Sequence, residues 1–360
     1  MNAPRLGVIL CCVLALAATS AVAVTAQQTG GQTQEIQSCT NITASGTYVL
    51  TADITSATDV CIQIAASNVT LSGEGRTVTG NGSGLGISTF ETNRDNVTVS
   101  NVTVSNWEAG ISASGSTNVT VQNVAAVNNT DGVRTSFAFD VAVRNVTATN
   151  NTRGVVLESA RNSTVRGVTA TDNAVGLRLL DADGVGVANT TSTGNIVGAS
   201  LRLTDDASFT SVNLSDNGEG ALSAEATDGP FVAQTLQIGN ATVDARGRNV
   251  SVAEVGVGPT PPDNRTAVGG FLAVQPLNAS GWFDVAIRYT DDAVAGIDES
   301  ALALWRFQND SWTELESSVD ADRNRVAGNV TAAGTVGILA DGTTPPPEST
   351  ATATQANATG

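Results

Sequence analysis

The chain has 360 residues, of which 34 are acidic and 17 basic, and its formal net charge is −17. An acidic surface of this strength repels nucleic acid and anionic lipid, so we expect neither as a partner. Hydrophobic residues make up 41% of the chain, too many for a wholly disordered protein, and the acidic, Lys-free composition favours a protein of a halophile over one with a merely biased composition.

Residues 1–26 have the pattern of a signal peptide. Arg5 precedes an apolar run over residues 6–24, and small residues lead to a cleavage site after Ala26. An uncleaved membrane anchor is the alternative. No later segment reaches the roughly 20 apolar residues that span a bilayer. We therefore expect a secreted or cell-surface protein without a stable membrane span after cleavage.

Residues 39–95 carry a degenerate form of a repeat that becomes regular farther along the chain. Cys39 and Cys61 are 22 residues apart, which equals the period of that repeat. Equivalent residues in neighbouring turns of a β-helix lie about 4.8 Å apart, within the Cα separation that a disulfide requires. We predict a Cys39–Cys61 disulfide within an irregular N-terminal cap, with two free buried thiols as the alternative.

Residues 96–228 repeat every 22 residues in columns of Gly, of apolar residues and of Asn. The columns read Gly110, Gly132, Gly154, Gly176, Gly198 and Gly220; Val99, Val121, Val143, Val165, Val187 and Phe209; Asn101, Asn123, Asn145 and Asn189; and Asn129, Asn151, Asn173, Asn195 and Asn217. Apolar alternation predicts strands, Asn predicts bends in the left-handed backbone conformation, and Gly is expected at positive φ. The sequence therefore predicts an all-β, right-handed parallel β-helix of about eight rungs.

The 22-residue register ends after Asp228, at Gly229 and Pro230. Strand-like runs follow at residues 250–257, 268–274, 282–289, 301–307 and 336–339, with polar hairpin turns at 308–311 and 320–325. We predict a small, separate antiparallel β-sandwich-like module over residues 232–340 and a disordered Thr/Pro-rich tail over residues 341–360.

Residues 39–54 and 61–73 resemble the opening segment of NosD-like right-handed β-helix proteins from haloarchaea, and the rungs are similar to that family's repeats. Residues 294–306 and 311–315 resemble a C-terminal module of archaeal surface proteins. The resemblance implies a pectin lyase-like parallel β-helix. It also implies a role in copper maturation, which we disfavour because copper prefers imidazole, thiolate and thioether ligands and the mature chain has no His or Met.

Acidic residues at one corner of successive rungs form the candidate site for a cation or for catalysis. These carboxylates include two pairs that are 22 residues apart: Asp181, Asp183, Asp205, Asp206 and Asp228. Oxygen ligands at this spacing suit Ca²⁺. The catalytic candidates combine three of these carboxylates with two nearby guanidinium groups: Asp183, Asp205, Asp206, Arg178 and Arg202. A solvated acidic edge, with no cofactor, is the interpretation that we favour.

Arg144 and Arg166 lie one rung apart on the predicted outward face. Like charges placed directly opposite each other are unfavourable, so we expect acidic groups beside them. Ordinary surface ion pairing is the favoured interpretation, and contact with an acidic sugar is the alternative.

Sequons of the Asn-x-Ser/Thr type are frequent because the repeat itself is rich in Asn and Thr. Export permits glycosylation of some of them, although Asn residues within the ladders cannot all carry glycans. The candidates are Asn96, Asn118, Asn145, Asn240, Asn278 and Asn329.

These patterns favour a non-catalytic secreted or cell-surface β-helix that interacts with glycans or other surface proteins. The alternative is a lyase or hydrolase acting on acidic polysaccharide, which rests on analogy with other parallel β-helices alone. The sequence does not indicate an oligomeric state.

Overall fold

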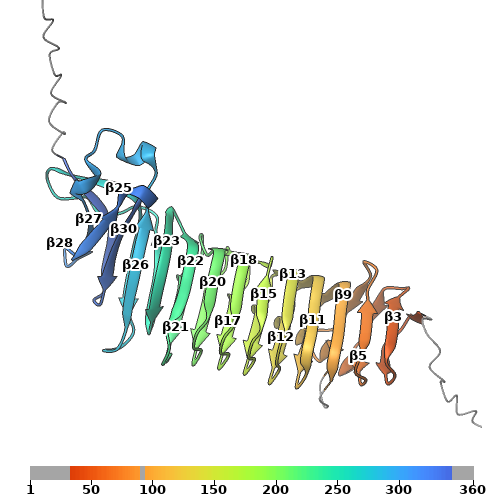
Figure 1. The fold of residues 1–360 in the computed structure, drawn as a ribbon. Helices are drawn as coiled ribbons and strands as arrows, with labels where there is room; N and C mark the ends of the chain where they lie inside the picture. Colours follow the sequence, from red (N-terminus) through yellow and green to blue (C-terminus); the bar gives the residue numbers. More distant parts are fainter. Residues whose placement is uncertain (1–32, 90–93, 343–360) are drawn as a thin grey trace, which may run out of the picture. The chain divides into compact units, whose positions relative to one another are not determined.

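The computed structural model describes residues 33–89 and 94–342 of the chain. The predicted signal peptide, residues 1–26, and residues 343–360 of the predicted tail lie outside the described residues. Within them the fold is all-β: a right-handed parallel β-helix of about nine turns, followed by antiparallel strands (Figure 1). The predicted fold class is thus confirmed.

Each regular turn of the β-helix contributes strands to two sheets. Within the β-helix the first sheet contains β1 (Gln34–Ile36), β3 (Gly46–Leu50), β4 (Ile54–Thr55), β6 (Val69–Ser72), β7 (Thr77–Thr79), β9 (Asp95–Ser105), β11 (Thr117–Val127), β13 (Ala142–Thr149), β15 (Thr164–Arg166), β16 (Thr169–Thr171), β18 (Gly186–Thr193), β20 (Ser208–Asn213) and β22 (Phe231–Ile238). The second sheet contains β2 (Thr40–Ile42), β5 (Val60–Ile64), β8 (Leu85–Ser88), β10 (Ala109–Ser114), β12 (Asp131–Ser136), β14 (Arg153–Glu158), β17 (Val175–Leu180), β19 (Val197–Arg202) and β21 (Gly220–Glu225).

The 22-residue register is confirmed by parallel strand pairing in the first sheet. Val99 of β9 pairs with Val121 of β11, which in turn pairs with Val143 of β13. The same column continues through Val165, Val187 and Phe209. All these side chains are buried. Because each fully buried side chain of this size contributes about 1.5–3 kcal/mol, the apolar columns supply much of the driving force for stacking.

The first predicted bend is confirmed in the backbone. Asn101, Asn123, Asn145 and Asn189 have φ values of 54°, 53°, 50° and 47°. Asn tolerates this left-handed region better than other non-Gly residues do. The side-chain amides also form hydrogen bonds along the stack. Asn123 donates to Asn101 and Asn145 donates to Asn123, each at a distance of 3.2 Å.

The second bend contains a buried ladder of Asn side chains. The Oδ1 atom of Asn151 accepts from the backbone N–H of Asn129 at 2.9 Å, and its Nδ2 atom donates to the carbonyl of Ala126 at 3.0 Å. The pattern is repeated one rung on, where Asn173 accepts from the backbone N–H of Asn151. Side-chain amides therefore satisfy backbone groups that the bend removes from the sheets.

The Gly column next to this ladder corrects one expectation. These glycines do not adopt the predicted positive φ; the left-handed residues of the bend precede the ladder and include Asn128 and Asn150. Gly is required for space instead. A Cβ atom added to Gly132 would lie 2.5 Å from the carbonyl oxygen of Gly154 in the next rung. The column thus allows close approach of successive rungs.

Gly220 does not continue that column, which is a second correction. Val197 of β19 pairs with Gly220, a separation of 23 residues, so Gly198 faces the carbonyl of Ala221. Asn217 still accepts from the backbone N–H of Asn195 at 22 residues. The extra residue therefore lies between the Asn ladder and the start of β21.

The predicted disulfide is confirmed. Cys39 and Cys61 are bonded, with a Cα–Cα distance of 4.4 Å. The bridge joins the N-terminal turns, where Thr40 of β2 pairs with Ile62 of β5 at the same 22-residue separation.

The strands after the repeat extend both sheets of the β-helix. The first sheet adds β23 (Ala241–Arg248), β26 (Trp282–Arg288), β29 (Ser317–Asp320) and β30 (Arg325–Val330); the second adds β24 (Val250–Val255), β25 (Arg265–Pro276), β27 (Leu302–Gln308), β28 (Ser311–Glu314) and β31 (Gly334–Asp341). Three short 3₁₀ helices, η1 (Asp291–Val294), η2 (Glu299–Ala301) and η3 (Ala321–Arg323), lie between them.

The change from parallel to antiparallel pairing occurs within continuous sheets. β22 pairs in parallel with β20 and antiparallel with β23, while β21 pairs antiparallel with β24. Both predicted hairpins are present, β27 with β28 and β29 with β30. The predicted boundary after Asp228 is thus the end of the repeat but not of either sheet. None of the helices in residues 33–89 and 94–342 has the length and hydrophobicity needed to cross a membrane.

Candidate functional site

The predicted acidic corner does not form a convergent cluster. The Oδ1 atom of Asp205 accepts from the backbone N–H groups of Asp228 and Gly229, at 2.9 and 2.6 Å. Likewise, Asp183 accepts from the backbone N–H of Asp205 at 3.2 Å. No group of three or more His, Cys, Asp or Glu side chains that could hold a metal ion occurs among the described residues. The carboxylates instead cap the turn of the following rung.

The remaining residues of that corner each have their own local surroundings. Asp181 accepts a 2.9 Å hydrogen bond from Ser159, and Asp206 is a turn residue with a φ of 54°. Arg202 lies 4.0 Å from Glu225, an exposed pair. Arg178 belongs to β17 of the second sheet and pairs in register with a serine. The described residues of this corner therefore do not converge on one point where a substrate could bind.

The glycosylation candidates differ in how free their amide nitrogen is. Three of them donate that nitrogen to another side chain: Asn96, Asn118 and Asn145, in the ladders. Asn329 donates to Asp284. Asn278 accepts from Ser280, while Asn240 lies exposed in the turn between β22 and β23. All six are exposed, and Asn240 and Asn278 are the two whose amide nitrogen donates no hydrogen bond to another side chain among the described residues.

A groove on the outward face of the first sheet is the strongest candidate site. Its volume is about 750 Å³, and it crosses β22, β23, β26, β30 and β29. The charged side chains that line it are Arg246, Arg288, Arg323, Arg325, Asp244 and Asp284. Strand alternation places these residues outward, while their neighbours Val243, Val285 and Val326 are buried.

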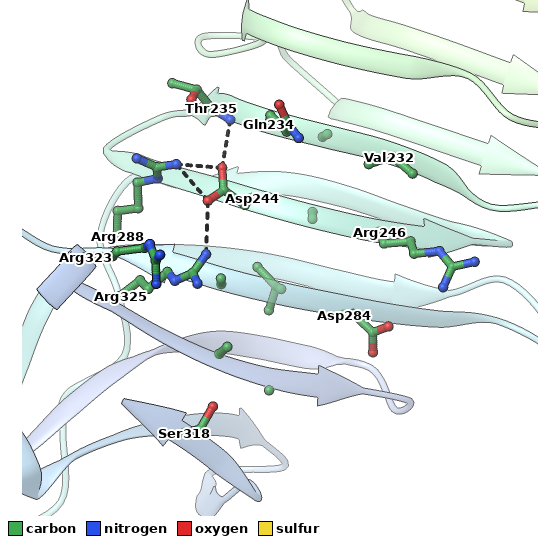
Figure 2. Close-up of a pocket in the computed structure, with 16 residues that line it drawn as sticks. Val232, Gln234, Thr235, Asp244, Arg246, Asp284, Arg288, Ser318, Arg323 and Arg325 are labelled. Carbon is green, nitrogen blue, oxygen red and sulfur yellow. Dashed lines mark hydrogen bonds and ion pairs between the residues drawn. The ribbon is translucent and has the colours of Figure 1, made fainter. Parts of the chain in front are cut away.

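Asp244 lies at the centre of an ion-pair network at one end of the groove (Figure 2). Arg288 donates through Nη2 to both its carboxylate oxygens, at 2.9 and 2.7 Å, and Arg325 lies 3.8 Å away. The backbone N–H of Thr235 donates to it as well, at 2.9 Å. This carboxylate is thus fully engaged in holding two guanidinium groups.

Asp320 supports the same guanidinium groups from the edge of the groove. It accepts from Arg323 at 3.1 Å and from Arg325 at 3.0 and 2.8 Å. The hydrogen bond from Arg323, followed by that from Arg325, holds the pKa of the Asp320 carboxyl below its ordinary value. The aspartate therefore stays ionised at neutral pH and keeps the arginines in place.

Arg246 lies at the other end of the groove and has a different environment. Its guanidinium carbon is 5.5 Å from the centroid of the Trp282 ring, a cation–π contact. Asp284 of β26 pairs with Arg246 in register, but among residues 33–89 and 94–342 no carboxylate oxygen lies within 4.0 Å of the Arg246 guanidinium nitrogens. Its hydrogen-bond donors are consequently open to a ligand.

The groove is electropositive in a strongly acidic chain. Four arginines and two aspartates line it, and including Asp320 still leaves one positive charge in excess. Over the whole chain, acidic residues outnumber basic ones, 34 to 17. Arginine presents a planar fork of donors that matches carboxylate, phosphate and sulfate groups. The site is thus suited to an anion.

The sequence did not single out this groove. Asp244, Arg288 and Arg325 are far apart in the chain and come together through antiparallel pairing of β23 with β26 and of β26 with β30. The available signal was an alternation of charged with buried apolar residues in residues 284–288 and 323–326. That alternation indicates an outward face, but not which strands are neighbours.

Comparisons with known proteins agree with the fold. A sequence profile described as "Right handed beta helix region" matches residues 86–235. No curated protein matches the sequence.

Several solved structures are similar at low identity. One is the A-module of mannuronan C-5 epimerase AlgE4 from Azotobacter vinelandii, with 15% identity, a TM-score of 0.36, and coverage of 54% of this chain and 70% of that chain. Another is the enzymatically active domain of tailspike protein 2 from bacteriophage CBA120, with 12% identity, a TM-score of 0.41, and coverage of 86% and 66%. A third is ORF18 of Geobacillus virus E2, with 12% identity, a TM-score of 0.36, and coverage of 77% and 70%.

Proposed function

We propose that this protein is a non-catalytic, exported β-helix protein that binds an anionic polysaccharide in the arginine-lined groove. The observation that carries the proposal is the excess of guanidinium groups over carboxylates in one groove of a chain with a net charge of −17. Arginines gathered on one face of an acidic chain give that face a local positive charge that attracts a polyanion. A carboxylated or sulfated sugar chain is such a ligand, since each acidic group can accept two parallel hydrogen bonds from one arginine.

Binding is favoured over catalysis by the state of the groove's carboxylates. A hydrolase needs one carboxyl group as an acid and another as a base or nucleophile. Asp244 already accepts from Arg288 and from the backbone N–H of Thr235, with Arg325 3.8 Å away, and Asp284 accepts from the Asn329 amide. These hydrogen bonds occupy lone pairs that proton transfer would require. The groove therefore supports recognition of charge.

An exported location supports the same proposal. The signal-peptide pattern of residues 1–26 directs export, and the Cys39–Cys61 disulfide forms in oxidising compartments. We infer a secreted or surface protein of a halophile, with Asn240 and Asn278 as the sites most open to glycosylation. It works without a cofactor.

The test is binding of acidic and neutral polysaccharides, measured by calorimetry in molar salt. We expect the acidic polymer to bind and the neutral one not to bind. The variant Arg246→Gln/Arg323→Gln should weaken binding about tenfold or more, because a hydrogen bond to a charged group contributes about 1.5–3 kcal/mol and 1.4 kcal/mol corresponds to a factor of ten.

The matched control is Arg178→Ala/Arg202→Ala, which removes the same charge from strands β17 and β19 of the second sheet. It should bind as the unmodified protein does. Equal weakening by both double variants would show that net charge, not the groove, governs binding. Turnover of an acidic polysaccharide would overturn the non-catalytic assignment in favour of a lyase or hydrolase.

A further inference from the structure

A second groove lies on the outward face of the first sheet, within the β-helix. Its volume is about 550 Å³. Arg144 of β13 and Arg166 of β15 stand at one end, paired in register. In the next rungs the arginine column continues as Ala188 and Thr210, and the neighbouring outward column continues from Thr164 as Gly186 and Ser208; these small residues form the floor. The guanidinium groups of Arg144 and Arg166 thus lie at one end of a groove lined by small side chains.

Arg144 and Arg166 lack the acidic neighbours that ordinary surface pairing would supply. No ion pair or hydrogen bond joins either guanidinium group to a carboxylate in residues 33–89 and 94–342. Stacked cations one strand spacing apart repel each other, so the arrangement is unfavourable without an anion. The expectation of surface pairing is therefore wrong for the described residues, and the alternative, contact with an acidic group, gains support.

The two grooves adjoin. Ser208 and Thr210 line the second groove, and they pair in register with Val232 and Gln234, which line the first. Val232 in turn pairs with Arg246. One outward channel therefore runs across neighbouring strands of the same sheet, with arginines at both ends and small or uncharged side chains between.

We propose that the two grooves form one track that binds a single extended polyanion, with Arg144 and Arg166 as a second anchoring point. The inference rests on the proposed function and specifies its ligand: a linear chain of acidic sugars. From Arg166 to Arg246 the track crosses β18, β20, β22 and β23, four strand spacings, or about 19 Å. A ligand shorter than this reaches one anchoring point only.

The experiment measures the affinity of oligogalacturonates of increasing length in molar salt. We expect short oligomers to bind weakly. Once the oligomer spans both anchoring points the affinity should rise about 100-fold, because the second contact becomes intramolecular. The variant Arg144→Gln/Arg166→Gln should remove that rise and leave the affinity of short oligomers for the first groove unchanged. Gln is tolerated structurally, since Gln122 and Gln234 occupy the same column.

The outcomes separate the two proposals. Long oligomers that bind Arg144→Gln/Arg166→Gln as tightly as the unmodified protein would overturn the track while leaving the first groove intact. Oligomers of every length that bind Arg246→Gln/Arg323→Gln and the unmodified protein equally would overturn the proposed function itself. The Arg178→Ala/Arg202→Ala control should retain the full length dependence, and its loss would also refute the track.

Discussion

Asp131 is a buried carboxylate held by an arginine of the next rung. Its side chain is fully buried, and Arg153 donates to its two oxygens at 2.6 and 2.9 Å. Burial raises the pKa of the Asp131 carboxyl above its ordinary value of 3.8, and the attraction of Arg153 offsets this only in part. The folded state therefore holds this proton more tightly than the unfolded chain does.

Asp131→Asn tests this balance through its pH dependence. A carboxyl with a raised pKa favours folding most below its unfolded pKa, and this contribution is lost as the pH rises through the folded value. Asn imitates the protonated form at every pH. We therefore compare the difference in melting temperature, variant minus unmodified protein, at two pH values. We expect this difference to be larger at pH 7 than below pH 3.8. The opposite sign in thermal melts would mean that the Arg153 pair outweighs burial.

Single residues also mark the limit of prediction from sequence. The left-handed conformations at Asn101, Asn123 and Asn145 were predictable because the residue type itself tolerates them. The role of the Gly column was not, because Gly serves equally for positive φ and for close packing. Only the position of the Gly154 carbonyl oxygen against Gly132 distinguishes the two.

At the scale of the element, the buried Asn ladder replaces backbone hydrogen bonds at every second bend. Asn151→Ala should leave the N–H of Asn129 and the carbonyl of Ala126 without partners. Each unsatisfied buried group costs about 1–3 kcal/mol, so for the two groups we expect a loss of about 2–6 kcal/mol in the free energy of unfolding. Denaturant titration measures it. Asn240→Ala, at an exposed turn residue, is the control and should change the free energy by less than about 0.5 kcal/mol.

The sequence predicted the repeat-bearing elements well and the others only as strands and local hairpins. A 22-residue period sets neighbours and register together, which is why the Cys39–Cys61 pairing followed from spacing. After Asp228 there is no period, so strand order depends on long-range antiparallel pairing. The groove that contains Arg246 and Arg288 could therefore not be predicted from the sequence. At the acidic corner, which we interpreted mainly as a solvated edge, the sequence did not show that Asp205 caps backbone N–H groups of the next rung.

At the scale of the whole molecule, the described strands form two sheets that continue from the β-helix into the antiparallel strands that follow it. Phe231 of β22 packs against Phe209 of the β-helix and Phe283 of β26, with ring centroids 6.4 Å apart in each case. A shared core of this kind couples the stability of the repeat to that of the strands that follow it.

Truncation after Asp228 tests that coupling. The shortened chain would expose the edges of β20 and β21, and Leu222 would lose its partner Val252. We expect calorimetry of the full chain to show one cooperative transition. The truncated chain should melt at a lower temperature and associate in light scattering, because open β edges and exposed apolar columns promote pairing between molecules. Two separate transitions in the full chain, one of them unchanged by truncation, would instead establish an independent C-terminal module.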